Sequence, residues 1–140
     1  MKAILITAAG NADVLQLQEV DKPALPSPHH LRVKLAAAGV NPLDTKLRTK
    51  PAYFPDTFPA ILGCDGAGVV EAIGNAVTRF KIGDSVYFNN GGLGGNLGDE
   101  SGCYAEYTLS PILNLVTALP IASTTPAPSQ PRIAGKLSGK

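Results

Sequence analysis

The 140-residue sequence has little of what marks several classes of protein. It contains two cysteines, Cys64 and Cys103, too few for a disulfide framework or a four-thiolate zinc site. Twelve basic residues nearly balance eleven acidic ones, so the net charge of +1 gives no electrostatic footprint for nucleic acid or an anionic membrane. No apolar run reaches the ~20 residues that span a bilayer, because Pro120 interrupts the best candidate, residues 112–122. We therefore expect a soluble, cytoplasmic protein with reduced thiols and no nucleic-acid or membrane partner.

Nucleotide-binding motifs are also missing. The nearest match to a dinucleotide fingerprint, GAGVVE at residues 66–71, has Glu71 in place of the third glycine. It also lies between a loop and a strand, without the helix N-terminus that would hold a pyrophosphate. The run GGLGGNL has Leu97 at the corresponding position, and no GxxxxGK run is followed by Ser or Thr. The sequence therefore predicts that the chain makes no standard phosphate cradle.

Candidate metal ligands and nucleophiles are few. His29 and His30 are adjacent in a proline-rich turn, where successive side chains point apart, so we expect a solvated turn rather than a metal site. Cys64 and Asp65 are both of ligand type, but two side chains do not close a tetrahedral site, and a small buried cysteine is the commoner outcome. The sequence has no GxSxG motif, and we expect the glycine-rich residues 91–102 to form a flexible surface loop.

Short apolar segments separated by glycine and proline predict a mainly β fold. In two of these segments apolar and polar residues alternate, which is typical of half-buried strands. The residues expected on their buried sides are Leu15, Leu17, Val20, Leu31, Val33, Leu35 and Ala37. Pro42 suits the first turn of a helix, and Leu43 and Leu47 then lie on one face, so one or two helical turns are expected there. Six or so short strands with little helix predict a small, partly open β-barrel with short helical turns.

The composition changes towards the C-terminus. From Ser123 the sequence consists largely of Ser, Thr, Pro, Ala and Gly, which cannot bury enough apolar surface to offset the entropy of ordering it. We predict one domain over residues 1–109 and a low-complexity, disordered tail over residues 110–140.

Four blocks follow one another in the first 109 residues: AAAGVNPLDTKLR, PAILGCDGAGVVEAIG, KIGDSVYF and GCYAEYTL. Their order and spacing resemble the GroES-like N-terminal domain of the medium-chain dehydrogenases/reductases. More narrowly, they resemble the zinc-independent quinone oxidoreductase (zeta-crystallin-like) branch. The resemblance implies a GroES-like (alcohol dehydrogenase-like N-terminal) barrel, which in the family forms one wall of a cleft against a following nucleotide-binding Rossmann domain.

The resemblance also implies roles for individual residues. Zinc-dependent relatives have a metal-binding cysteine at the position of Asn41, a histidine at Cys64 and a glutamate at Asp65, so we expect no zinc here. Asn41, Asp44 and Tyr53 are implied as catalytic residues near the nicotinamide and the substrate. Of these, Asn41 and Tyr53 are also implied to contact the cofactor.

The activity implied by the resemblance is NAD(P)H-dependent reduction of a quinone or enone, with the choice between NADPH and NADH open. The family's second domain is absent from the sequence, so we expect the separate chain to be inactive and unable to bind the cofactor alone. A natural truncated product, a fragment and a frameshifted gene model are all open. A non-catalytic binding or regulatory module that pairs with a full-length relative is the alternative, and a co-chaperonin shares the fold. A homo-oligomer is also open.

Overall fold

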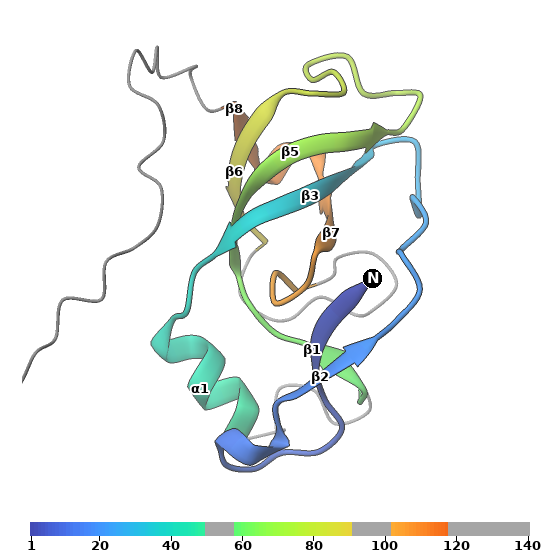
Figure 1. The fold of residues 1–140 in the computed structure, drawn as a ribbon. Coiled ribbons are helices and arrows are strands. Elements are labelled where there is room, and N and C mark those ends of the chain that lie inside the picture. Colours follow the sequence, from blue (N-terminus) through green and yellow to red (C-terminus); the bar gives the residue numbers. More distant parts are fainter. Residues whose placement is uncertain (50–57, 91–101, 118–140) are drawn as a thin grey trace, which may run out of the picture.

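The computed structural model describes residues 1–49, 58–90 and 102–117, and there the chain forms two antiparallel sheets and one short α-helix (Figure 1). The strands are β1 (Lys2–Ile6), β2 (Gln16–Glu19), β3 (His30–Ala38), β4 (Ala60–Ile61), β5 (Asp65–Ile73), β6 (Ser85–Asn89), β7 (Tyr107–Pro111) and β8 (Leu115–Thr117). The helices are α1 (Pro42–Thr49) and two 3-10 turns, η1 (Ala12–Val14) and η3 (Ile112–Asn114). The smaller sheet has the order β2-β1-β4, and the larger has the order β7-β3-β5-β6-β8.

The larger sheet curls around the main core. Its central pair, β3 and β5, has register shifts between Arg32 and Val33 and between Leu35 and Ala37, and such irregularities bend and twist a sheet. The curled sheet confirms the prediction of a mainly β, partly open barrel (Figure 1). The buried side chains of its core are Leu31, Val33, Val70, Val77, Phe80, Val86, Phe88, Cys103 and Leu115.

The smaller sheet and α1 stand beside this half-barrel. The backbone N–H of Ile4 donates to the carbonyl of Tyr104 at 2.7 Å, which ties β1 to the segment before β7. On α1, Leu47 is buried against Ile6 and Leu62, so this apolar side chain packs the helix against β1 and the residue after β4. The predicted helical turns starting at Pro42 are confirmed, and the helix extends to Thr49.

Two predictions of buried side chains are wrong. Leu17 is 69% exposed, because β2 is an edge strand with β1 on one side and no further layer over this face in the described chain. Ala37 is exposed as well, because the irregularity after Leu35 interrupts the alternation on which its inward orientation depended. Leu31 and Val33 are buried as predicted.

Residues 110–117, which the sequence pattern placed in the tail, contain the end of β7, the turn η3 and the strand β8, so they complete the larger sheet. β7 continues to Pro111, β8 pairs with β6, and Leu115 is 2% exposed. The three residues of β8 are too few to show the apolar–polar alternation of a strand, which explains why the predicted domain ended too early, at residue 109. The proposed tail from residue 118 onward lies outside the described residues. Within the described ranges no helix is long and apolar enough to cross a bilayer.

Candidate functional site

Asn41 occupies the connection between β3 and α1, immediately before the proline that starts the helix. Its backbone N–H donates to Oδ2 of Asp44 at 2.7 Å, the reciprocal bond of a capping box, in which an acidic residue three positions on satisfies the capping residue. Its side-chain Nδ2 donates to Oδ2 of Asp65 at 2.8 Å. The carboxamide is therefore held by a neighbouring strand and is not used to cap its own helix.

Asp44 is the buried centre of this region. It is 3% exposed, and its carboxylate accepts from Asn41, from the hydroxyl of Tyr104 at 3.0 Å and from the thiol of Cys64 at 3.5 Å. These donors come from three separate segments, so the carboxylate fastens the start of α1 to the chain around Cys64 and Tyr104.

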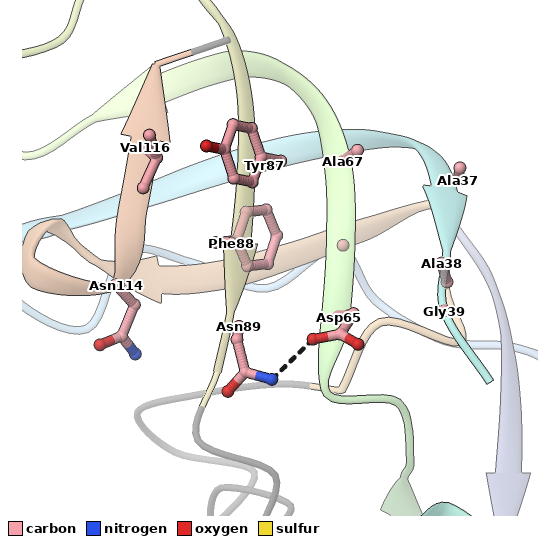
Figure 2. A pocket seen from close by; sticks show the side chains of 11 residues that line it. Ala37, Ala38, Gly39, Asp65, Ala67, Tyr87, Phe88, Asn89, Asn114 and Val116 are labelled. Carbon is pink, nitrogen blue, oxygen red and sulfur yellow. Dashed lines mark hydrogen bonds between the residues drawn. The ribbon is translucent and has the colours of Figure 1, made fainter. Parts of the chain in front are cut away.

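Asp65, the first residue of β5, joins Asn41 to a third segment. Its Oδ1 accepts from Nδ2 of Asn89, the last residue of β6, at 2.6 Å (Figure 2). Its backbone carbonyl accepts from the N–H of Gly39 at 3.0 Å. In the sequence, Asp65 stands out only as a residue of metal-ligand type, and no pattern marks Asn89 or Tyr104.

A broad open pocket of about 640 Å³ begins at this carboxylate. Figure 2 shows Asp65 and Asn89 together at one end, with Tyr87 and Val116 towards the other. Small residues at the ends of β3 and β5 form much of its lining: Ala37, Ala38, Gly39, Gly66 and Ala67. Tyr87 is 53% exposed and Val116 is 47% exposed, so this face combines uncovered apolar surface with a polar corner.

The remaining sequence candidates lie elsewhere. Tyr53 and the glycine-rich residues 91–101 lie outside the described residues. His30 pairs with Oγ of Ser27 at 2.7 Å, and His29 is exposed in the same turn. No group of three or more His, Cys, Asp or Glu side chains comes together within residues 1–49, 58–90 and 102–117.

Both thiols are buried and lie close to acidic groups. Burial, and then the neighbouring Asp44, raises the pKa of Cys64 to about 12. Burial, and then Cys64, raises the pKa of Cys103 to about 12. Burial, and then the hydrogen bond to Asp44, also raises the pKa of the Tyr104 phenol. All three groups therefore keep their protons and serve as donors or apolar filling at neutral pH.

This protonation state predicts slow thiol chemistry in the folded chain. At pH 8 the thiolate fraction of a group with a pKa near 12 is roughly a thousandfold below that of a group with a pKa near 9. We expect a chromogenic disulfide reagent to modify the native chain at least ~100-fold more slowly than the urea-unfolded chain. Complete modification of either cysteine in the native state within minutes would contradict this placement.

Comparisons with known proteins identify the fold family. The family model described as the alcohol dehydrogenase GroES-like domain matches residues 27–121. A curated quinone oxidoreductase from Lama guanicoe is 36% identical over 110 residues, which cover 79% of this chain and 31% of that protein. The chain thus spans less than a third of this relative.

Solved structures agree with the sequence comparison. A quinone oxidoreductase from Pseudomonas syringae superposes with a TM-score of 0.73 at 35% identity, over 87% of this chain and 34% of that one. An Escherichia coli quinone oxidoreductase complexed with NADPH superposes with a TM-score of 0.72 at 27% identity, over 85% of this chain and 33% of that one. The chain therefore belongs to the alcohol dehydrogenase GroES-like domain family, in the quinone oxidoreductase branch of the medium-chain dehydrogenases/reductases.

Proposed function

We propose that this chain is the substrate-side domain of a cytoplasmic, zinc-independent NAD(P)H-dependent quinone or enone oxidoreductase. The observation that carries the proposal is Asn41. By the family resemblance it takes the place of a metal-ligating cysteine. Its side chain is held by Asp65, which itself lines the open pocket. A fixed carboxamide can orient a planar ring or hydrogen-bond a carbonyl oxygen as that oxygen gains charge.

The described residues suit the nicotinamide end of the cofactor and not its pyrophosphate. They offer polar groups of the kind that hold a nicotinamide or a quinone oxygen. The sequence offers no glycine-rich turn leading into a helix for a pyrophosphate. When bound, NADPH would supply a hydride, which reduces the quinone while a proton from water completes the hydroquinone. We propose that the phosphates are held outside the matched region, which covers less than a third of the relative from Lama guanicoe, and that residues 1–140 alone are inactive.

Within this site we assign different roles to the three residues. Asn41 contacts the cofactor or the substrate, whereas Asp44 positions Asn41 by accepting its backbone N–H. Tyr53, which lies outside the described residues, is proposed as a second contact to the cofactor on the strength of the family resemblance alone. The two buried free cysteines suit a reducing compartment.

A fusion protein tests the proposal. Residues 1–117 of this chain would be fused to the nucleotide-binding half of a quinone oxidoreductase relative. We expect the fusion to oxidise NADPH only when a quinone is present, and the unfused chain to show no turnover. If a folded fusion binds NADPH but reduces neither quinones nor enones, the chain is a non-catalytic module and the proposal is wrong. Elemental analysis of the same preparation should find well under one zinc per chain.

A further inference from the structure

We propose that Asp65 is a positioning residue that sets the orientation of the Asn41 carboxamide and keeps it fixed through a second bond to Asn89. This inference rests on the proposed role of Asn41 at the reaction site. Asp65 takes no part in the chemistry itself.

The carboxylate is shared between two amides. Oδ2 accepts from Nδ2 of Asn41 at 2.8 Å, and Oδ1 accepts from Nδ2 of Asn89 at 2.6 Å. The three residues belong to the β3–α1 connection, the start of β5 and the end of β6. Because each oxygen holds a different segment, rotation of the carboxylate would break both bonds at once. The second bond therefore stabilises the geometry of the first.

The chemistry of the pair determines which way the Asn41 amide faces. An ionised carboxylate only accepts hydrogen bonds, so the NH₂ group and not the carbonyl oxygen of Asn41 must face it. This removes the usual ambiguity between the two ends of an asparagine amide. The carbonyl oxygen Oδ1 of Asn41 accepts no hydrogen bond from the described part of the chain, so Asn41 keeps this acceptor and one remaining N–H available. A quinone ring or a nicotinamide carboxamide can use such a donor and acceptor.

The backbone of Asp65 is held as firmly as its side chain. Asp65 pairs with Asn89 in the β5–β6 ladder, and its carbonyl accepts from Gly39 on the opposite side. A Cβ atom at Gly39 would lie 3.0 Å from Cβ of Asp65 and 3.2 Å from its Oδ2. Gly39 therefore leaves the space that the carboxylate needs to reach Asn41. Substitution at Gly39 offers a steric way to disturb the bond without removing any polar group.

The experiment uses the 140-residue chain and observes the Asn41 side chain directly by NMR. The two NH₂ resonances of ¹⁵N-labelled Asn41, assigned with Asn41→Ser, should exchange with water roughly tenfold more slowly than those of an exposed asparagine. Asp65→Asn and Gly39→Ala should each remove this protection and shift both resonances. Asp84→Asn is the matched control, since Asp84 accepts from Lys81 in a distant turn and does not touch the site.

The melting temperature separates orientation from folding. Faster exchange at Asn41 in both variants, with a melting temperature within a few degrees of the native chain, supports the proposal. Unchanged Asn41 resonances in folded Asp65→Asn or folded Gly39→Ala would overturn it. If Asp65→Asn does not fold, Gly39→Ala, which keeps every polar group, decides alone. An inactive fusion together with the expected NMR result would refute the proposed function and leave the orientation of Asn41 established.

Discussion

Asn41→Ala should lower kcat for quinone reduction by roughly ten- to a hundredfold in the fusion enzyme, with little change in the KM for NADPH. One orienting hydrogen bond to a partly charged group contributes about 1–3 kcal/mol, which converts to this range of rates. Asn41→Asp should be at least as damaging, because it replaces the donor facing Asp65 by a second carboxylate and creates repulsion between like charges. Steady-state kinetics measures the turnover of each variant, and thermal melts on the same preparations measure its stability.

Thr45→Ala is the control on the same helix. Its hydroxyl donates to the carbonyl of Pro42 and its side chain is exposed, so turnover should stay within about twofold of the parent. Asp65→Asn should lower kcat less than Asn41→Ala and should add nothing in the Asn41→Ala background, because it acts through that residue. A folded, fully active Asn41→Ala fusion would remove Asn41 from the reaction. An Asn41→Ala fusion that is less stable but has unchanged turnover per folded molecule would likewise show that Asn41 has only a structural role.

Gly68→Ala should destabilise the domain more than any substitution at the site. A Cβ atom there would lie 2.1 Å from the carbonyl oxygen of Lys34 and 3.0 Å from Cα of Leu35. Both obstacles are backbone atoms of β3, which is paired on both edges and cannot retreat without breaking a ladder. We expect a loss on the order of 3–5 kcal/mol in the free energy of unfolding, enough to leave much of the chain unfolded.

Ala67→Gly, one position earlier in the same strand, is the matched control. It removes the atom that Gly68→Ala adds, and it should cost only ~0.5–1 kcal/mol through the greater freedom of the unfolded chain. Urea unfolding followed by far-ultraviolet circular dichroism measures both variants. A Gly68→Ala chain as stable as the native one would mean that β3 and β5 do not approach each other as closely as described.

The sequence predicts the strands of the barrel and the start of the helix after Asn41, because both depend on local patterns. The alternation of apolar and polar residues in β3 indicates a strand, and the proline after Asn41 indicates the start of a helix. Each of these signals involves only a few neighbouring residues. The contacts that organise the site are not local. Asp65 lies 24 residues from Asn41, and Tyr104 lies 60 residues from Asp44, so no spacing rule connects them. The burial of Asp44 could not be predicted for the same reason, since it depends on segments that only the fold brings together.

The order of strands in the larger sheet has a consequence during synthesis of the chain. β3 lies between β5 and β7, so its two partners are made after it, and β7 is among the last described segments to leave the ribosome. Until then, one edge of β3 has unpaired N–H and C=O groups beside the apolar side chains of Leu31 and Val33. A nascent chain stalled before residue 107 therefore exposes an unpaired strand edge that is prone to aggregation. A chaperone that binds extended apolar segments would bind at this edge.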